Sequence, residues 1–441
     1  MGTDLTRALD AAGVLVADTR ELPGAERPRE RGVEQAATAI TVDDPGAGWG
    51  QMALLTDELG AVSWHFAPRP DAAAPSARDA SPRAAATRTY HIPASTPRAR
   101  GLVSAVGKRV LQVLVFPILE PGIGLISDAF AGHWEQKHRP YRLRTFAPSD
   151  YADAAAGQID GEGWRRLSAG RALLLVHGTF SRAHTAFGAL PPEFVAALHR
   201  RYQGRVFAFD HFTLSEDPRQ NVAWLIEHLP DGTALDLDIV CHSRGGLVSR
   251  VLSECQADLV LGSRTVRVGS IVFVGTPNRG TTLADADHMG DFIDTYTNLL
   301  TFLPDTGATE VLTAIVTVAK QLAVGAAKGL PGLQAMRPDG EFAKWLNAGA
   351  RAGNTRYFAL ASDFTPGEPG LKAFALDRLM DKIFEAANDL VVPTDGVFQA
   401  NGSSFFPIEQ RMVFGGTDAV AHTGYFASGA AREKMLTWLS G

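Results

Sequence analysis

The feature that most constrains this chain is a serine between a strand-like run and a helical pattern. From Asp236 to Leu252 the sequence is DLDIVCHSRGGLVSRVL, in which an apolar run leads to Ser243 and directly into an amphipathic segment. A serine at such a strand-to-helix corner projects its hydroxyl from the sheet when its neighbours are small. Gly245 is one small neighbour, and Cys241 takes the place of the first glycine in the usual G-x-S-x-G pattern. We predict that Ser243 is a nucleophile; the alternative is an ordinary loop before a helix.

Charge and cysteine content exclude several classes of function. The chain has 42 Lys and Arg residues and 48 Asp and Glu residues, a formal net charge of −6 without long runs of one sign. Nucleic-acid binders carry a basic surface, so we do not expect one here. The two cysteines, Cys241 and Cys255, lack zinc-type spacing, and no His, Asp or Glu cluster supplies it. We therefore expect a reducing compartment, no metal and no cofactor.

The sequence predicts no targeting or membrane-spanning segment. The N-terminus contains Asp4 and Asp10 and only a short apolar run, which differs from a secretory signal. Two longer apolar stretches, residues 103–130 and 311–330, contain lysines, and a lysine at mid-membrane costs about 2.5 kcal/mol or more. We expect a cytoplasmic protein with no transmembrane segment, in which these stretches are buried or contact a membrane surface transiently.

The first 140 residues are expected to form a small β-rich domain and a connection. Apolar runs at residues 39–42, 52–55 and 61–66 have strand-like spacing, with clear alternation in the last. We place this domain at residues 1–67. Residues 68–88 are rich in Ala, Pro, Arg and Ser, which is typical of a linker. Mixed helical signals at residues 103–120 lead us to interpret residues 68–140 as a linker and an apolar helical bridge.

Strands and helices alternate from residue 141 to residue 441. Apolar runs at residues 172–176, 205–209, 270–274 and 356–361 are separated by helical patterns. This order predicts βαβ units, and hence a mostly parallel sheet with helices on both faces. A helical insertion at about residues 283–350 is much longer than an ordinary connection of ~4–6 residues. We expect it to form a cap over the carboxyl edge of the sheet, where open α/β sheets bind ligands.

A serine nucleophile needs a histidine that accepts its proton. Downstream of Ser243 the chain offers His288 and His422. We favour His422, because it lies between a strand-like run and the C-terminal helical pattern, whereas His288 lies in the expected cap. The general base in this chemistry follows the nucleophile along the chain in α/β-hydrolases, as His422 does.

A carboxylate must then hold the histidine in the correct tautomer. We favour Asp389, which begins the strand-like run DLVVP after a helical pattern. Asp363, just after the strand at residues 356–361, is the alternative, and Asp395 is a third candidate. Each of the three could instead be a solvated loop carboxylate or a helix cap.

An acyl-transfer site also needs two backbone N–H groups for the oxyanion. The amide of Arg244, next to the nucleophile, is one expected donor. The second is expected from the loop after the first strand of the large sheet, HGTF, through the amide of Thr179 or of Phe180. The side chain of His177 is expected to order this loop rather than to transfer protons.

Cys241 and His242 suggest a different nucleophile–base pair. Adjacent side chains on a strand point to opposite faces of the sheet. We therefore set aside a cysteine nucleophile with His242 as its base.

Five segments, in order, resemble the lipase and esterase-like branch of the α/β-hydrolase family: LLLVHGTFS, CHSRGGLVSR, VGTPNRGT, NDLVVP and AHTGYF. They cover about residues 172–426. The resemblance implies a nucleophile at Ser243, an acid at Asp389, a base at His422, and oxyanion donors at Thr179 and Arg244. Residues 1–140 have no counterpart in it.

We therefore predict a serine hydrolase that cleaves carboxylic esters of small molecules or lipids through an acyl-enzyme. A thioesterase or an amidase with the same residues is the alternative within enzymes. From another class, the alternative is an inert hydrolase-fold scaffold that recruits a protein partner through the N-terminal domain.

Overall fold

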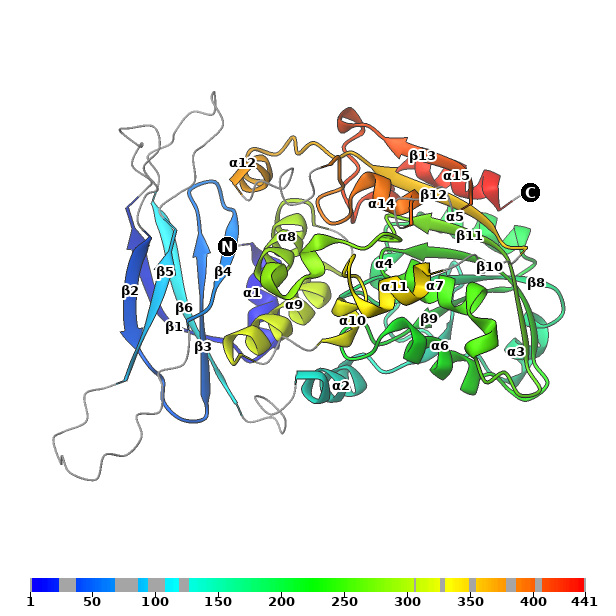
Figure 1. The fold of residues 1–441 in the computed structure, drawn as a ribbon, viewed down its shortest axis with the longest axis horizontal. Coiled ribbons are helices and arrows are strands. Elements are labelled where there is room, and N and C mark those ends of the chain that lie inside the picture. The colour runs from blue at the N-terminus through cyan, green and yellow to red at the C-terminus, as the bar shows by residue number, and fades with distance from the viewer. Residues whose placement is uncertain are drawn as a thin grey trace.

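The computed structural model describes the following residues: 2–23, 37–67, 86–93, 108–118, 127–304, 307–325, 330–348, 354–377, 386–400 and 407–439. Figure 1 shows an antiparallel β region at one end of the molecule, a group of helices in the middle, and a larger α/β region at the other end. In the described part of the chain, no helix is long and apolar enough to cross a membrane.

The α/β region is built on a sheet that has seven strands among the described residues, in the order β13-β12-β11-β10-β8-β9-β7. Every neighbouring pair is parallel except β7 with β9. The strands are β7 (Arg142–Thr145), β8 (Arg171–Val176), β9 (Val206–Asp210), β10 (Ala234–His242), β11 (Thr265–Val274), β12 (Arg356–Ser362) and β13 (Ile408–Phe414).

The central strands are apolar on both sides because helices cover both faces of the sheet. Leu174 and Ile239 belong to one buried cluster, whereas their neighbours Leu173 and Val240 belong to another. Parallel sheets buried on both faces have this continuous apolar pattern. The helices around the sheet are α2 (Ser127–His138), α3 (Gly161–Leu167), α4 (Ala183–Ala186), α5 (Pro192–Arg201), α6 (Pro218–Glu227), α7 (Gly245–Glu254), α14 (Thr394–Phe398) and α15 (Gly429–Trp438). Helix α12 (Pro369–Asp377) lies away from the sheet and packs against helix α8 (Met289–Phe302). The predicted mostly parallel sheet with helices on both faces is confirmed.

The N-terminal region begins with helix α1 (Thr3–Ala11) and continues as antiparallel sheets. A four-stranded sheet in the described residues has the order β1-β6-β3-β4, and β2 pairs with β5 beside it. The strands are β1 (Leu15–Leu22), β2 (Thr38–Asp43), β3 (Trp49–Thr56), β4 (Val62–His65), β5 (Thr87–Ile92) and β6 (Arg109–Pro117). A β-rich N-terminal region is therefore present, as predicted.

The predicted helical bridge is wrong in its first part, where the structure has a strand. Residues 109–117 form β6, which pairs with β1 on one side and β3 on the other, so the β region extends beyond residue 67. An apolar run of this length is ambiguous between helix and strand, and the pairing with two partners decides it. The linker at residues 68–88 lies outside the described residues as far as residue 85, and β5 begins at Thr87. Further along, helix α2 occupies the second part of the expected bridge.

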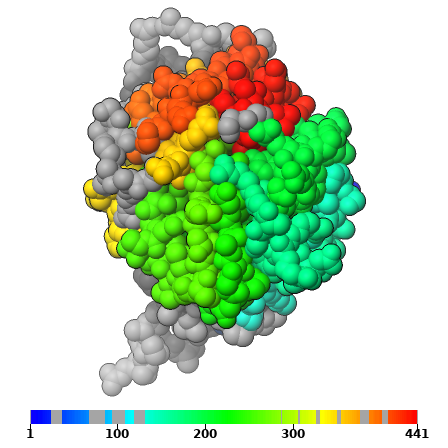
Figure 2. All heavy atoms as spheres, turned by 90° about the vertical axis from the view of Figure 1, so that its right-hand side faces the viewer, coloured from blue at the N-terminus to red at the C-terminus, as the bar shows by residue number. Residues whose placement is uncertain are grey.

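The predicted helical cap is confirmed and lies between the two regions. It contains α8 (Met289–Phe302), α9 (Ala308–Ala323), α10 (Pro331–Gln334) and α11 (Glu341–Asn347). Helix α8 packs against β4, and α9 packs against β3 and α1. Figure 1 shows α8 and α9 between the N-terminal strands and the large sheet. Figure 2 shows the end of the molecule that lies on the right in Figure 1, where green, teal, orange and red segments of the α/β region form the surface.

Candidate active site

Ser243 occupies a sharp turn between the end of β10 and the start of α7. Its φ angle is 52°, in the left-handed region that is costly for a residue with a side chain. The turn is possible because its neighbours are glycines. A Cβ on Gly178 would lie 2.7 Å from Cβ of Ser243, and a Cβ on Gly245 would collide with the backbone oxygen atoms of Val176 and His177. This is the geometry of a nucleophile elbow.

Ser243, His422 and Asp389 form a continuous chain of hydrogen bonds. The Oγ of Ser243 is 3.0 Å from Nε2 of His422, and Nδ1 of His422 is 2.8 Å from Oδ2 of Asp389. All three side chains are buried, with exposed fractions of 1% for Ser243, 0% for His422 and 1% for Asp389. With an ionised carboxylate on Nδ1, the histidine presents a bare Nε2 to the serine hydroxyl, as a general base requires.

The loops after β12 and β13 bring Asp389 and His422 together. The N–H of His422 donates to the backbone oxygen of Asp389 at 3.1 Å. The sequence predicted that Asp389 begins a strand, and this is wrong. Asp389 lies in a turn that is closed by an isolated bridge between Asn388 and Pro393, with Leu390 at a φ of 78°. The turn lets two backbone N–H groups reach the carboxylate, those of Val391 at 3.0 Å and Val392 at 2.7 Å.

The other sequence candidates lie elsewhere. Asp363 follows β12 but is exposed, and its backbone N–H donates to Phe414. Asp395 is exposed in the first turn of α14. His288 lies just before α8, where its Nδ1 is 3.3 Å from Oδ2 of Asp291.

The two predicted oxyanion segments meet at Ser243. Among the described residues, the backbone N–H groups of Arg244, Thr179 and Phe180 donate to no protein acceptor, so both candidates for the second donor stay open. His177 lies under this loop: its Nδ1 donates to the backbone oxygen of Gly178 at 2.9 Å, and its Nε2 accepts from the N–H of His211 at 3.1 Å. Burial lowers the pKa of His177 to about 3, so its ring is neutral.

The side chain of Arg244 ties the elbow to the cap. It is fully buried, and its Nε donates to the backbone oxygen of Gly332, in α10, at 2.9 Å. A second nitrogen donates to the backbone oxygen of Glu216. Burial lowers the pKa of Arg244 to about 10, which leaves the guanidinium charged at neutral pH.

Cys241 and His242 are not a pair. The thiol of Cys241 lies in the core and donates to the backbone oxygen of Val272 at 3.4 Å, and burial raises its pKa to about 12. The ring of His242 lies beside that of His422, with centroids 4.9 Å apart, and its Nε2 donates to the backbone oxygen of His422 at 2.9 Å. Burial is the main cause, and the neighbouring His422 the second cause, that lowers the pKa of His242 to about 3. His242 is therefore neutral, and its hydrogen bond holds the backbone of His422 in place.

Three residues near the hydrogen-bonded Ser243, His422 and Asp389 were not identified from the sequence. The hydroxyl of Tyr425 donates to Oδ2 of Asp389 at 3.0 Å. Gly275, with a φ of 55°, leaves room for the carboxylate: a Cβ there would be 3.2 Å from Oδ2 of Asp389 and 3.3 Å from Cε1 of His422. The segments AHTGYF and VGTPNRGT contain both residues and could have indicated them. Tyr296 lies on helix α8 of the cap, and no sequence motif indicated that it lies near this site.

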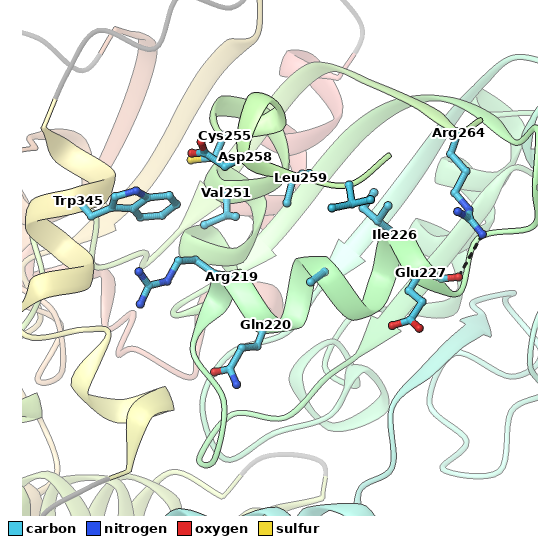
Figure 3. Close-up of a pocket in the computed structure, with 12 residues that line it drawn as sticks. Arg219, Gln220, Ile226, Glu227, Val251, Cys255, Asp258, Leu259, Arg264 and Trp345 are labelled. Atoms are coloured by element: carbon cyan, nitrogen blue, oxygen red, sulfur yellow. Dashed lines mark hydrogen bonds between the residues drawn. The ribbon is translucent and has the colours of Figure 1, made fainter. Parts of the chain in front are cut away.

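A small cavity of about 40 Å³ is lined by His242, next to Ser243 in the chain, and by Thr179 of the predicted oxyanion loop. Its polar lining includes Thr179, Ser181, His242, Tyr296 and Thr423, and its apolar lining includes Leu300, Ala308 and Val311. A larger cavity of about 620 Å³ lies between α6, α7 and α11. Figure 3 shows Trp345 and Arg219 at one end of that larger cavity and Arg264 near Glu227 at the other. Ser243, His422 and Asp389 line neither cavity, but His242, next to Ser243, lines the small one. Within the described residues, no group of three or more His, Cys, Asp or Glu side chains could hold a metal ion.

The sheet order, its single antiparallel edge strand and the Ser243 turn define an α/β-hydrolase. More specifically, the chain belongs to the family described as Domain of unknown function (DUF7379), whose model matches residues 138–440. No curated protein sequence matches the chain.

Several solved structures share part of the fold. Lipase 1 from Pelosinus fermentans is 15% identical with a TM-score of 0.42, over 60% of this chain and 98% of that one. Bacillus licheniformis lipase BlEst2 is 14% identical with a TM-score of 0.37, over 61% and 91% of the two chains. The metagenomic carboxyl esterase MGS0156 is 16% identical with a TM-score of 0.33, over 62% and 76%. At these values the similarity carries no information about substrate.

Proposed function

We propose that the protein is a serine hydrolase that cleaves carboxylic esters, with Ser243 as nucleophile, His422 as general base and Asp389 as the acid that orients it. The observation that supports this most is the buried hydrogen-bonded chain from Ser243 Oγ through His422 to Asp389. A serine hydroxyl is a weak nucleophile alone, and this arrangement is the one that activates it.

The first half of the reaction forms an acyl-enzyme. His422 Nε2 accepts the Ser243 proton while Oγ attacks the ester carbonyl carbon. The negative charge that develops on the carbonyl oxygen is stabilised by the N–H groups of Arg244 and of Thr179 or Phe180. The tetrahedral intermediate collapses, the bond to the alcohol oxygen breaks, and the proton on Nε2 passes to the departing alcohol.

The second half releases the acid. A water molecule loses a proton to His422 Nε2 and attacks the acyl carbon, and Ser243 Oγ departs as it regains that proton. Asp389 remains ionised throughout and balances the charge of the protonated imidazole.

The cavity beside Ser243 supports an apolar acyl group. Leu300, Ala308 and Val311 line one side of it, and the volume of about 40 Å³ is far below the ~300–1,000 Å³ of a pocket that encloses a drug-sized ligand. Short acyl chains are therefore expected to react fastest while the cap is in place, and longer lipid chains require Leu300 and Val311 to move apart. Thioesters and amides react through the same acyl-enzyme, so a substrate panel must include them.

An active-site label tests the assignment. A fluorophosphonate probe should modify the wild-type protein at one residue, and peptide mass analysis should locate the adduct on Ser243. Ser243→Ala should not be labelled. Absence of labelling in the wild type, or equal labelling of Ser243→Ala, would refute the proposal and favour an inert scaffold.

A further inference from the structure

Tyr296 brings a second hydroxyl to the nucleophile from the cap. It lies on α8 and is buried, and its ring meets the ring of His422 edge-on at 5.9 Å between centroids. On its other side it meets Phe180, in the oxyanion loop, edge-on at 5.2 Å. The ring therefore spans the space between the base and the oxyanion loop.

Tyr296 also contributes to the wall of the small cavity, beside His242 and Thr179. Within the described residues, the side-chain hydrogen bond of Ser243 Oγ is to His422 Nε2. Burial raises the pKa of Tyr296, and the nearby Ser243 hydroxyl opposes that rise. The cavity of about 40 Å³ that Tyr296 and Thr179 line has room for a group the size of a water molecule. The carbonyl oxygen of a substrate bonded to Ser243 is a group of this size.

We propose that Tyr296 is a further catalytic residue, whose hydroxyl donates a hydrogen bond to the oxyanion that forms when Ser243 attacks an ester. This inference rests on the proposed ester hydrolysis and extends it. Catalytic hydrogen bonds in a substrate-free site are often long and shorten only when the reacting group is bound. The phenol keeps its proton across the working pH range, so it is a donor wherever His422 is an effective base.

The N-terminal sheet holds Tyr296 in this position through the opposite side of α8. Oδ1 of Asn298 accepts from the N–H of Val62 at 2.9 Å, and its Nδ2 donates to the backbone oxygen of Val62 at 2.7 Å. Oδ1 of Asp294 accepts from the N–H of Trp64 at 2.8 Å. Residues four apart lie on one face of a helix, so Asp294 and Asn298 together satisfy the exposed edge of β4.

The contact gives the β region a role in the chemistry. The indole Nε1 of Trp64 donates to Oγ1 of Thr297 at 3.1 Å, between the two edge contacts. Tyr296 lies in the same turn of α8 as these three residues, so a rotation of the helix that releases β4 also moves the phenol. Asn298 is thus a positioning residue that acts through Tyr296.

The first test removes the hydroxyl alone. Tyr296→Phe should lower kcat for p-nitrophenyl acetate by about 10²-fold, with KM changed much less, because the donor acts mainly in the transition state. Tyr151→Phe is the matched control, since its buried hydroxyl donates to the backbone oxygen of Leu190 and should leave kcat unchanged. An unchanged kcat in Tyr296→Phe, or an increase, would overturn the inference, because an increase would mean that the phenol only obstructs the site.

The second test asks whether Asn298 acts through Tyr296. Asn298→Ala should lower kcat several-fold, and the double variant Tyr296→Phe/Asn298→Ala should be no slower than Tyr296→Phe. Thr301→Ala, on the same helix, removes only a bond within α8 and serves as the control. Additive losses would overturn the role of the sheet. A wild type that turns over no ester would refute the proposed function, whereas an active wild type with an unaffected Tyr296→Phe would refute only this inference.

Discussion

At the scale of single residues, Asp389 is the most constrained group of the site. Its Oδ2 accepts from His422 and from Tyr425, and its Oδ1 accepts from the N–H groups of Val391 and Val392. Hydrogen bonds to a charged acceptor are the stronger kind, and four of them fix the carboxylate in one orientation. Asp363 has no such environment, since it is exposed.

This difference predicts the outcome of two matched substitutions. Asp389→Asn should lower kcat by about 10⁴-fold, because an amide in this position favours the wrong tautomer of His422. Asp363→Asn should change kcat by less than about twofold. Steady-state turnover of a p-nitrophenyl ester measures both, and a large loss in Asp363→Asn with a small one in Asp389→Asn would reverse the assignment of the acid.

The sequence indicated three residues that the structure brings together. Ser243 was indicated by its small neighbours, His422 by its position between a strand-like run and the C-terminal helical pattern, and Asp389 by its position at the start of the run DLVVP. Tyr296 could not be found in this way, because nothing in the sequence of a cap helix says which of its faces meets the nucleophile. The role of Leu390 in shaping the acid turn also depends on a φ of 78° that its side chain does not suggest.

At the scale of elements, the edge of β4 is satisfied by a helix instead of a strand. An unpaired strand edge is a site for pairing with another chain, and natural sheets cover or charge such edges. Here Asp294 and Asn298 accept the N–H groups of Trp64 and Val62. The contact therefore stabilises the sheet and anchors α8 at once.

Removing one of these acceptors should expose its amide selectively. In Asp294→Ala the N–H of Trp64 loses its partner, and an unsatisfied buried donor costs about 1–3 kcal/mol, which corresponds to roughly 5–150-fold faster hydrogen exchange. The amide of Leu54, in the neighbouring strand β3, is the internal control and should keep its protection. Equal protection of Trp64 in the wild type and the variant would show that Asp294 does not cover the edge.

Strands β4 and β6 differ in how well the sequence predicted them. The alternation in residues 61–66 identified β4, because one side of that strand is buried and the other is not. Residues 109–117 have apolar side chains on both sides of the strand, so their spacing favours neither the two-residue repeat of a strand nor the ~3.6-residue repeat of a helix. For this reason β6 was predicted to be part of a helical bridge. Its identity depends on pairing with β1 and β3, strands that lie far from it in sequence.

At the scale of the whole molecule, one apolar core joins the β region, the cap and the large sheet. A single buried cluster includes Leu54 and Trp64 of the N-terminal sheet, Phe292 of the cap and Ile239 beneath the elbow. The regions that the sequence suggested as separate are thus packed as one body. Sequence composition at residues 68–85 gives no hint of this packing, because the contacts are made by strands and helices on either side of it.

Buried neutral histidines should make the whole molecule sensitive to mild acid. Burial lowers the pKa of His177 and of His242 to about 3, and it lowers the pKa of His211 well below its usual value. The unfolded chain binds these protons at about pH 6.5, whereas the folded chain does not. The free energy of unfolding is therefore unaffected by the titration of these histidines above pH 6.5. It falls as the pH drops from there toward 3, by about 1.4 kcal/mol per pH unit for each histidine.

Urea unfolding between pH 6.5 and pH 5 measures this effect. The free energy of unfolding should fall with pH in the wild type, and the slope should be smaller in His242→Gln, which cannot titrate. A slope that is flat in the wild type, or identical in the variant, would show that these rings are protonated in the folded protein.

The most direct test of the central claim is the turnover of p-nitrophenyl acetate by three proteins: wild type, Ser243→Ala and Ser249→Ala. Ser249 is also buried, on α7, but its hydroxyl donates to the backbone oxygen of Gly245 and does not meet His422. The account predicts that the wild type and Ser249→Ala hydrolyse the ester at similar rates and that Ser243→Ala loses about 10⁶-fold in kcat. Turnover by Ser243→Ala at the wild-type rate would contradict it.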